Sequence, residues 1–402
     1  MSWEKIKIGE CCKITSSKRI FFSEYVESGV PFYRSKEIIE SANGQEISEP
    51  LFISQEKYDE IKSKFGVPQS GDMLLTSVGT IGIPYVVKDD DLFYFKDGNL
   101  TWFREFDNRL NSQYLYYWVK SSEGQNVLNN TTIGSSQKAL TIASLKDLEI
   151  PCPSIGVQKG IIEILAGYDD LIENNQKQIK LLEEAAQRLY KEWFVDLHFP
   201  GHETTLIVDG IPERWKRMVL SEVTSVLKRG ITPKYSNNGK YSVINQKCIR
   251  NSIMDISESR RQEKEYATTL NLQDSDTVIC STGAGTLGRV GRVYGDYPNT
   301  TFDSHVTLIR AKENPNYIYH VIKSQQEYLM GMGRGSTNQQ ELYRDVIEQL
   351  VVLCPSQDIL LKAERVLGAI HCKIKKIYLQ NNLLVESRDR LLPKLMSGEL
   401  EV

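Results

Sequence analysis

The chain lacks the features that mark several large classes of protein. No apolar run approaches the roughly 20 residues that a membrane-spanning helix needs, so no membrane partner is expected. The first residues, MSWEKIKIGE, lack the basic and apolar regions of a signal peptide. The 7 cysteines are an odd number and form no CxxC pair. We therefore expect free thiols in a reducing, cytoplasmic environment and no disulfide framework.

Common catalytic signatures are also missing. The sequence has no GxxxxGK[ST] loop, no HExxH, and no Pro-Pro dipeptide, which excludes the [DN]PP[FY] motif of adenine methyltransferases. Only 5 histidines occur. His198 and His202 are four apart, but Pro200 and Gly201 between them break any shared helical face. We expect no metal site and predict a protein without catalysis of its own.

Basic and acidic side chains are nearly equal in number. The chain carries 49 Lys and Arg against 52 Asp and Glu, a formal net charge of −3. Residues 1–151 contain more acidic than basic side chains, and residues 201–353 contain slightly more basic ones. Any contact with DNA must therefore use local basic patches and not a basic body.

The chain does contain a long internal duplication. Trp3 and Trp215 open the two copies, GTIG at 79–82 matches GTLG at 285–288, and Cys152-Pro153 matches Cys354-Pro355. The offset falls from 212 to 206 to 202, as small differences in loop length would produce. A long unit that occurs only twice is not a solenoid. Two similar modules related by a pseudo-two-fold axis are expected, which suits a partner that also has two halves.

Each copy divides into a globular and a helical part. The globular parts alternate short β-like runs with helical periodicity, which predicts mixed α/β domains. The expected strands are 72–76, 85–88, 276–280 and 307–310, and the expected helices are 111–120 and 317–330. The predicted domains are 1–151, 152–205, 206–353 and 354–402, of which the second and fourth are helical.

The helical parts carry apolar residues at alternating spacings of four and three, from Ile161 in the first copy and from Ala363 in the second. This spacing predicts two long antiparallel coiled-coil helices, each roughly 50–55 Å long. Pro393 is expected to kink or end the second helix. The simpler alternative is a pair of amphipathic helices that each pack on their own domain. The main seam residues are Leu165, Ile172, Asn175, Ile179, Leu182, Leu189, Leu367, Ile374, Ile377, Asn381, Leu384 and Leu391.

An antiparallel register follows if the two seams pair end to end. Ile161 then faces Leu395, and Trp193 faces Ala363. Asn175 faces Asn381, and a buried Asn pair would determine the register at some cost in stability. Tyr168 faces Arg388, which would allow a cation–π contact.

The segment Gly283-Ala284-Gly285-Thr286-Leu287-Gly288 reads GxGxxG, and Asp303 follows at the spacing of a dinucleotide-binding fingerprint. However, the next residues, RVGRVYGDYP, predict strand and turn instead of a helix, and the first copy lacks the leading glycines. We therefore favour a glycine-rich hairpin that lets backbone approach a ligand closely. A nucleotide-dependent enzyme remains an alternative.

Polar side chains recur at corresponding places in both globular parts. Arg, Lys, Asn and Gln bond base edges in the major groove, while Ser, Thr, Tyr and backbone N–H groups hold phosphates. A solvated surface loop is the alternative for any one of them. The candidate DNA-contacting residues are Lys18, Arg19, Arg34, Lys36, Ser77, Thr80, Asn130, Thr132, Ser135 and Gln137 in the first copy, and Arg229, Lys234, Tyr235, Asn245, Lys247, Arg289, Arg292, Arg334, Asn338 and Gln339 in the second.

Four helical segments carry a family resemblance. SLKDLEIPCPSIGVQKGIIEIL and VIEQLVVLCPSQDILLKAERVL, with AQRLYKEWFVDLHFPG and RDRLLPKLMSGELEV, resemble the specificity subunit of type I restriction-modification systems. The resemblance covers the whole chain in the order of target-recognition domain, spacer helix, target-recognition domain, spacer helix. The acidic first domain departs from a picture of strong DNA binding by this subunit alone.

The resemblance implies that each recognition domain reads one half of a bipartite, asymmetric site in double-stranded DNA. The helices would set the gap and dock two modification subunits, and restriction subunits would join that core. S-adenosylmethionine, ATP and Mg²⁺ would reside on those partners and not on this chain. Half-sites read from one face should lie about one helical turn, roughly 34–36 Å, apart. A coiled-coil adaptor without DNA specificity is the remaining alternative.

Overall fold

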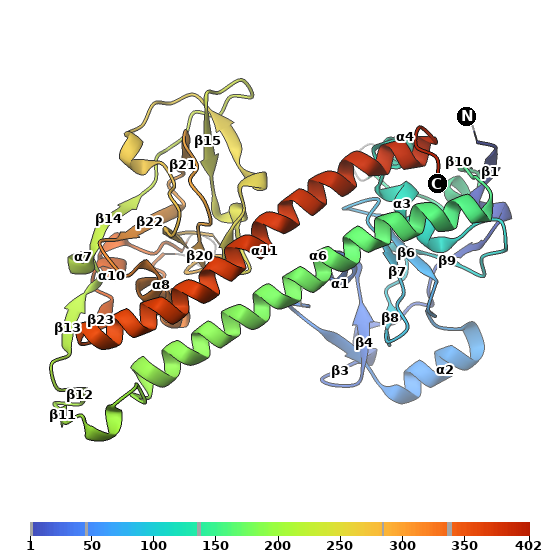
Figure 1. Ribbon diagram of the computed structural model, residues 1–402. Coiled ribbons are helices and arrows are strands. Elements are labelled where there is room, and N and C mark those ends of the chain that lie inside the picture. Colours follow the sequence, from blue (N-terminus) through green and yellow to red (C-terminus); the bar gives the residue numbers. More distant parts are fainter. Residues whose placement is uncertain (1–2, 45–46, 135–137, 284, 336–339) are drawn as a thin grey trace. The chain divides into compact units, whose positions relative to one another are not determined.

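The computed structural model describes all residues except 1–2, 45–46, 135–137, 284 and 336–339. The chain forms two compact units, one of residues 1–174 with 381–402 and one of residues 175–380. Each unit combines a mixed α/β globular part with segments of two long helices, α6 (Ile155–Tyr190) and α11 (Gln357–Ser397) (Figure 1). The mixed α/β fold and the two long helices are as predicted.

The first unit contains two four-stranded sheets, in the orders β2-β9-β6-β7 and β3-β5-β4-β8, and the pair β1-β10. All pairings are antiparallel except β4 with β8. The strands are β1 (Lys5–Lys7), β2 (Lys13–Thr15), β3 (Tyr25–Val26), β4 (Val30–Tyr33), β5 (Leu51–Ile53), β6 (Met73–Thr76), β7 (Pro84–Val86), β8 (Tyr94–Phe95), β9 (Leu100–Arg104) and β10 (Glu149–Pro151). The helices are η1 (Ile8–Glu10), η2 (Phe22–Glu24), α1 (Ser35–Ala42), α2 (Gln55–Phe65), α3 (Ser112–Lys120), α4 (Ser122–Thr131) and α5 (Ile142–Lys146).

The second unit repeats this plan with a six-stranded sheet, β14-β22-β19-β20-β17-β16, a three-stranded sheet, β18-β15-β21, and the pairs β13-β23 and β11-β12. The strands are β11 (Ile207–Val208), β12 (Ile211–Pro212), β13 (Lys216–Val219), β14 (Thr224–Arg229), β15 (Tyr241–Ile244), β16 (Ile249–Arg250), β17 (Ile253–Met254), β18 (Arg260–Gln262), β19 (Thr277–Cys280), β20 (Val290–Arg292), β21 (Thr300–Phe302), β22 (Val306–Ala311) and β23 (Val351–Cys354). The helices are η3 (Lys191–Val195), η4 (His202–Thr204), α7 (Leu220–Val223), η5 (Gln246–Cys248), η6 (Ile256–Glu258), η7 (Thr268–Leu270), α8 (Pro315–Ser324), α9 (Gln326–Gly331) and α10 (Arg344–Glu348).

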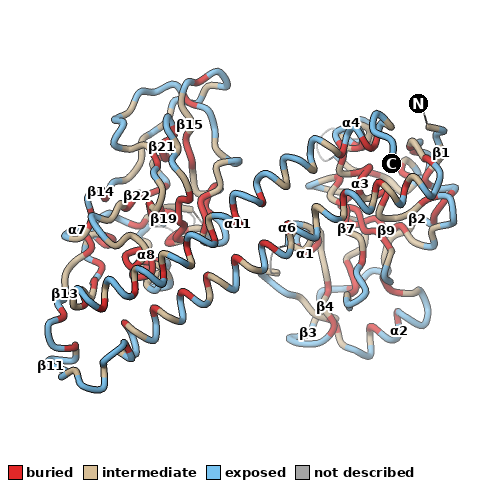
Figure 2. Tube along the Cα trace, in the orientation of Figure 1, coloured by how far each residue is buried: buried red, intermediate tan, exposed pale blue. Residues whose placement is uncertain are grey.

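The central strand of each main sheet is apolar because both of its faces are covered. In β6, Met73 and Leu75 pack in one core cluster and Leu74 packs in another. In β19, Ile279 packs in one cluster while Val278 lies in a second. Successive side chains of a strand point to opposite faces, so a continuous apolar run is what a doubly covered strand requires. Figure 2 shows these buried strands in red.

The predicted strands are confirmed within a few residues by β6, β7, β19 and β22. The predicted helix 111–120 is α3, whose first turn is capped by the Asn111 side chain accepting a hydrogen bond from the Gln113 N–H at 2.8 Å. The predicted helix 317–330 is wrong as one element, because it breaks at Gln325 into α8 and α9. As predicted, β20 and not a helix follows the GxGxxG segment.

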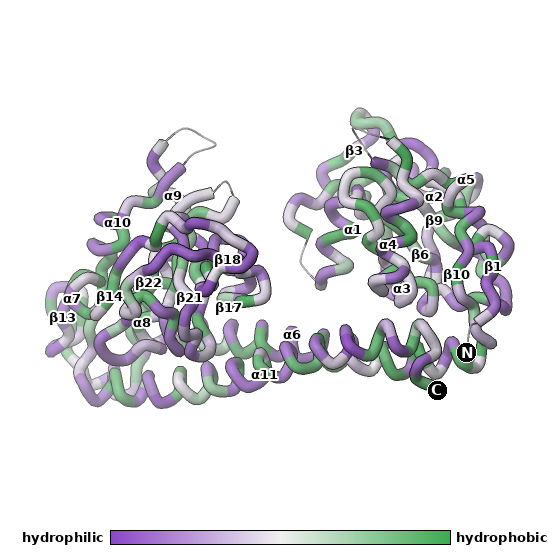
Figure 3. Tube along the Cα trace, turned by 90° about the horizontal axis from the view of Figure 1, so that it is seen from above, coloured by the Kyte–Doolittle hydropathy of each residue, from purple (hydrophilic) through white to green (hydrophobic). Residues whose placement is uncertain are grey.

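Within each unit the two long helices contact each other over their apolar seam. In the first unit Ile161 and Leu165 share a core cluster with Leu392 and Leu395. In the second unit Ile179 lies in one cluster with Ile374 and Ile377, and Trp193 packs on the cluster that holds Ala363. The early part of α6 thus meets the late part of α11, and the reverse, which is the antiparallel order predicted. Figure 3 shows hydrophobic and hydrophilic residues alternating along both helices.

The same clusters also contain sheet and helix residues of the globular parts, such as Trp118 in the first unit and Tyr317 in the second. The coiled-coil interpretation and the alternative of packing on each domain therefore both hold in part. Seam residues Leu165, Ile172, Asn175, Ile179, Leu367, Ile374, Ile377 and Asn381 are buried, and Leu182, Leu189, Leu384 and Leu391 are half-buried.

The polar positions of the predicted register differ in detail. The Arg388 guanidinium donates to Asp169 at 2.6 Å and also meets Asp389, so an ion pair replaces the predicted cation–π contact with Tyr168. The Asn381 side chain donates to the Ile172 carbonyl at 3.4 Å. Asn175 belongs to the other unit, so its pairing with Asn381 stays a prediction.

Helix α11 does not end at Pro393, so of the two expected effects of this proline only a kink stays a prediction. Helix α11 continues through Pro393 to Ser397 and stops at Gly398, whose φ of 73° suits a residue without Cβ. Proline removes one backbone hydrogen bond. Burial of the neighbouring Leu392 and Leu395 offsets that loss, because both side chains pack in the core of the first unit.

Candidate nucleic-acid interface

A buried pair of hydroxyl groups anchors the glycine hairpin in each copy. The Oγ of Ser77 lies 2.7 Å from Oγ1 of Thr101, and the Oγ of Ser281 lies 2.6 Å from Oγ1 of Thr307. All four residues are buried. The prediction that Ser77 contacts DNA is therefore wrong, since its side chain is 2% exposed and is bonded within the domain.

Backbone contacts next to these hydroxyls join the hairpin to the later polar loop. The Leu140 N–H donates to the Ser77 carbonyl at 2.9 Å, and the Leu342 N–H donates to the Ser281 carbonyl at 2.8 Å. The structure thus brings together two loops that the sequence presented separately. In the first copy β-bridges link Val78 to Ala139 and Ile133 to Ala139, and in the second they link Thr282 to Glu341 and Arg334 to Glu341. We call these sets the first junction (Val78, Ile133, Ala139) and the second junction (Thr282, Arg334, Glu341).

The second junction also receives the end of β14. The Arg229 Nε donates to the Ser304 carbonyl at 2.5 Å, and its Nη1 forms an ion pair with Glu341. The hydroxyl of Thr282 lies 2.5 Å from Nδ1 of His305. Among these residues only Arg229 and Arg334 were candidates from sequence. Glu341 and His305 were missed because an acidic or isolated residue gives no DNA-binding signal without its neighbours.

In the second unit, Arg289 joins two loops that carry predicted DNA-contacting residues. The Arg289 guanidinium donates to the Ile249 carbonyl at 3.0 Å and to the Gly285 carbonyl at 3.1 Å. It therefore ties the glycine hairpin to the segment that follows η5. The Asn245 side chain caps η5 by accepting a hydrogen bond from the Lys247 N–H at 2.8 Å. Lys247 itself is exposed.

Arg292 cannot read DNA as predicted. Its side chain is 1% exposed, and its guanidinium donates to the Pro315 carbonyl at 2.9 Å and to Oδ1 of Asn316 at 2.7 Å. It also lies over the Tyr319 ring, 5.1 Å from the ring centroid. The sequence showed a basic residue beside a glycine, but β20 turns this side chain into the core.

The basic candidates of the first unit are largely paired with carboxylates. Arg34 donates to the buried Glu37 at 2.6 Å, and Lys36 pairs with Glu49 at 3.0 Å. Burial raises the pKa of Glu37, but the Arg34 hydrogen bonds outweigh it and hold that pKa below its ordinary value. Arg19 pairs with Asp97 at 2.9 Å but is 67% exposed. The positive charge available to a phosphate is correspondingly small.

Equivalent tyrosines flank the sheets β3-β5-β4-β8 and β18-β15-β21, and Tyr25 is half-buried whereas Tyr235 is exposed. Tyr25 pairs with Ile53 in β5, and Tyr235 bridges to Gln262 in β18. The ring of Phe22 meets Tyr25 edge-on at 5.6 Å. Over Tyr235 lies instead a guanidinium, that of Arg260, 3.6 Å from the ring centroid. Phe22 is 87% exposed and was missed, although adjacent phenylalanines beside a basic run were a signal for base stacking.

The remaining candidates lie at the surface or outside the described residues. Ser135, Gln137, Asn338 and Gln339 are not among the described residues. Lys234 is exposed and pairs with Glu263. Thr132 is half-buried, and Lys18, Thr80, Asn130 and Arg334 are exposed.

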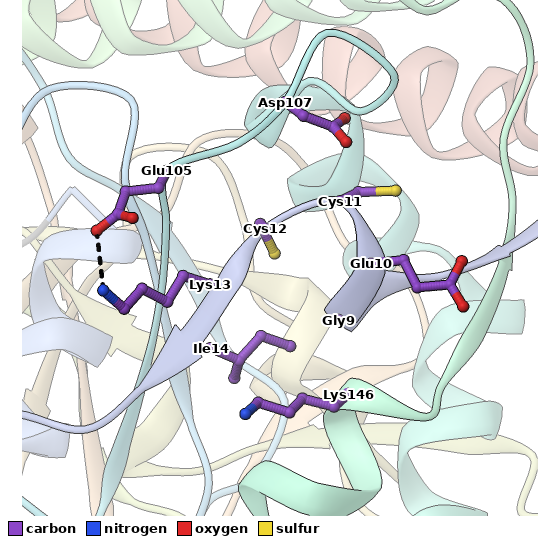
Figure 4. Close-up of a pocket in the computed structure, with 9 residues that line it drawn as sticks. All are labelled: Gly9, Glu10, Cys11, Cys12, Lys13, Ile14, Glu105, Asp107 and Lys146. Carbon is purple, nitrogen blue, oxygen red and sulfur yellow. Dashed lines mark hydrogen bonds and ion pairs between the residues drawn. The ribbon is translucent and has the colours of Figure 1, made fainter.

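Open clefts occur at corresponding edges of the two main sheets, away from the junctions. One, of about 370 Å³, lies between β2 and α5, and the other, of about 390 Å³, lies between β14 and α10. Figure 4 shows the first, with the Lys13–Glu105 ion pair at its side. Burial raises the pKa of Cys12 to about 12, so this thiol is not activated as a nucleophile.

Neither a cluster of metal ligands nor a membrane-spanning helix occurs among the described residues. No group of three or more His, Cys, Asp and Glu there could hold a metal ion. Among the helices that are described, none is long and apolar enough to cross a membrane. All 7 cysteines are free.

Several known proteins are similar to this chain in sequence or in fold. A family model described as "Type I restriction modification DNA specificity domain" matches residues 1–184 and 212–359. The type I restriction enzyme MjaIX specificity subunit of Methanocaldococcus jannaschii is 29% identical over 352 residues, which cover 83% of this chain and 78% of that protein. The HindI specificity subunit of Haemophilus influenzae is 23% identical over 335 residues, covering 65% and 71%. The crystal structure of the type I S subunit from M. genitalium matches with a TM-score of 0.57 at 18% identity, covering 98% of this chain and 96% of that one, which supports the fold.

Proposed function

The chain belongs to the type I restriction-modification DNA specificity family, and from this premise we propose that it reads a bipartite DNA sequence with one half-site for each globular domain. One observation carries the proposal. The two copies of the family domain share a hydrogen-bonded framework at Ser77 and Ser281 but present different side chains around it. A common framework with different surfaces is what recognition of two different half-sites requires.

The proposal includes a division of labour between the elements. Residues 1–151 and 206–353 read the two half-sites, and the half-sites differ in sequence. The long helices α6 and α11 set the gap between them and dock two modification subunits, which restriction subunits then join. This chain performs no catalysis, and the groups that react, S-adenosylmethionine, ATP and Mg²⁺, bind to the partner subunits.

The ion-paired state of the basic residues supports reliance on those partners. Arg34, Lys36 and Arg19 in the first unit each have a carboxylate neighbour. A carboxylate neighbour reduces the positive charge that each of these three residues offers to the phosphate backbone, and release of counterions from that backbone supplies most non-specific affinity for DNA. We therefore propose that the modification subunits supply much of the phosphate contact.

Mapping of methyladenine tests the proposal. The chain is co-expressed with its modification subunit, and the methylated positions of the host DNA are read by sequencing. The expected result is one asymmetric motif of two short halves separated by a gap of constant length. No new methylation by an intact modification subunit would instead favour a coiled-coil adaptor without DNA specificity.

A further inference from the structure

Equivalent positions in the two domains can be assigned from hydrogen bonds and strand register alone. Thr101 and Thr307 are equivalent because each bonds the buried serine of its copy. Thr15 pairs with Trp102, the residue after Thr101, and Lys228 pairs with Leu308, the residue after Thr307. The next residue along each first strand, Ser16 or Arg229, is therefore equivalent as well.

One more pair completes the set. The Ser77 N–H donates to the Asn99 carbonyl at 2.8 Å, and the Ser281 N–H donates to the His305 carbonyl at 2.7 Å. Asn99 and His305 are thus equivalent. Together with the two junctions, five positions surround the base of the glycine hairpin in each domain.

The side chains at these five positions differ in a consistent direction. The first domain has only neutral residues there, and three of them are apolar, whereas the second domain has two arginines, a glutamate, a histidine and a threonine. The five are Ser16, Val78, Asn99, Ile133 and Ala139 in the first domain, and Arg229, Thr282, His305, Arg334 and Glu341 in the second.

Arg229 is held in one orientation at the centre of the charged set. Its Nε is bonded to the Ser304 carbonyl and its Nη1 is paired with Glu341. The side chains remain partly open to solvent, 29% exposed for Arg229 and 36% for Glu341. An oriented guanidinium at the surface can donate to the neutral acceptors O6 and N7 of guanine, the commonest base-specific contact.

The carboxylate of Glu341 affects the two kinds of DNA contact differently. It lies at the guanidinium, where it repels an approaching phosphate and cancels much of the attraction of Arg229 for it. A guanine edge carries no net charge, so the same carboxylate interferes with it much less. Glu341 thereby disfavours non-specific contact with the backbone and favours contact with a base edge.

We propose that Arg229 reads a guanine in the half-site of the second domain and that Glu341 is its positioning residue, which holds the guanidinium toward the base and away from phosphates. The inference rests on the proposed function, because it requires that residues 206–353 face a half-site. The first domain has Ser16 and Ala139 at the two positions and reads its half-site there without a charged pair.

The test uses the chain in complex with its modification subunits. Methyladenine mapping gives the motif, and DNA binding measured at several salt concentrations gives the salt dependence. Arg229→Ala should relax one base pair of the second half-site and weaken binding to the specific site by about ten- to a hundredfold. Glu341→Ala should relax the same base pair and steepen the dependence of log affinity on log salt by about one, as for one added phosphate contact.

Glu341→Gln separates orientation from charge. Its amide oxygen can still accept from Arg229, so the motif should be kept while the salt dependence steepens. Glu348→Ala is the matched control, because it removes the 2.6 Å surface pair with Arg344 in α10 and should change neither quantity. Thermal unfolding of each variant verifies that it is folded.

A failure of the proposed function and a failure of the proposed roles of Arg229 and Glu341 would give different results. A wild-type complex without a bipartite motif would overturn the proposed function itself. A normal wild-type motif that Arg229→Ala and Glu341→Ala both leave intact would overturn the inference and leave the function standing. A loss of stability with unchanged motif and salt dependence would show that the Arg229–Glu341 pair is only structural, and Glu341→Gln decides the case if Glu341→Ala does not fold.

Discussion

Buried polar residues of the second unit form a connected network where α6, α8, α11 and β20 meet. The Nδ1 of His371 lies 2.8 Å from the Tyr294 hydroxyl, and its Nε2 lies 2.9 Å from Nε2 of His320. The Tyr319 hydroxyl donates to Glu183 at 3.4 Å. Such a network is stable only while its members keep the protonation states that burial favours.

Burial determines those states. It raises the pKa of Glu183 to about 7, against the opposing effect of the Lys323 and Arg292 charges. Burial, together with the smaller effect of the Arg292 and Lys323 charges, lowers the pKa of His320 to about 3. The pKa of His371 falls for the same reason. At neutral pH both imidazoles are uncharged, and Glu183 is close to its midpoint.

Stability should therefore depend on pH through Glu183. Because its folded pKa of about 7 exceeds the ordinary 4.5, its stabilising contribution is full below pH 4.5 and is lost as pH rises through 7. The two histidines act oppositely, since their stabilising contribution is present above pH 6.5 and is lost as pH falls. The free energy of unfolding of Glu183→Gln, minus that of the wild type, should therefore increase by up to about 3 kcal/mol from pH 5 to pH 8. Denaturant unfolding at both pH values measures this gain, and an effect independent of pH would contradict it.

Arg289 supports a narrower prediction about DNA. It links the carbonyls of Ile249 and Gly285, so its removal should loosen the glycine hairpin of the second domain. Arg289→Ala should weaken or relax only the half-site read by residues 206–353, by about 1–3 kcal/mol if the arginine touches a guanine. Methyladenine mapping and binding to DNA with either half-site altered provide the measurement. An effect confined to the other half-site would contradict the prediction.

Among the elements, those with strong periodicity could be predicted from sequence. Continuous apolar runs predicted β6 and β19 because both faces of these strands are covered, and the alternating four-three spacing predicted α6 and α11. The end of α11 was not predictable from Pro393, because tertiary packing of Leu392 and Leu395 overrides the local cost of proline.

The candidate site was predictable only as a set of loops. Ser77 and Arg292 looked like surface residues because both lie within two residues of a glycine, yet the strand ends turn them inward. Glu341 gave no signal by itself, since its role depends on Arg229, which is distant in sequence and adjacent in the fold. Pairings of this kind arise from tertiary structure and have no local pattern.

The spacer helices can be tested as elements. Insertion of seven residues in register into both α6 and α11 adds about 10.5 Å to each helix. At about 3.4 Å for each base pair, the gap should lengthen by about three base pairs while both half-sites stay the same. Methyladenine mapping reads gap and half-sites together, and altered half-sites with an unchanged gap would exclude a spacer role. Insertion of three residues, which rotates the seam out of register, serves as the control and should disrupt the complex.

In the whole molecule, the two copies of the duplication share a framework and differ in the side chains around it. The buried serine–threonine pairs, the backbone junctions and the helix seams recur in both copies, so the framework is the same. The side chains around that framework, which are half-buried or exposed, differ from a neutral set in the first domain to a charged one in the second. The repeated framework thus determines the geometry of the two domains. The side chains that differ between them determine which DNA sequence each domain prefers.

We propose that each domain reads its own half-site on a shared framework. Replacing residues 206–353 with a second copy of residues 1–151 tests it most directly, with methyladenine mapped after co-expression with the modification subunit. We expect a symmetric motif in which the first half-site appears twice, in inverted orientation, and the second half-site is lost. Retention of the original asymmetric motif would show that recognition lies outside the exchanged domain, and the second domain would then not read a half-site of its own.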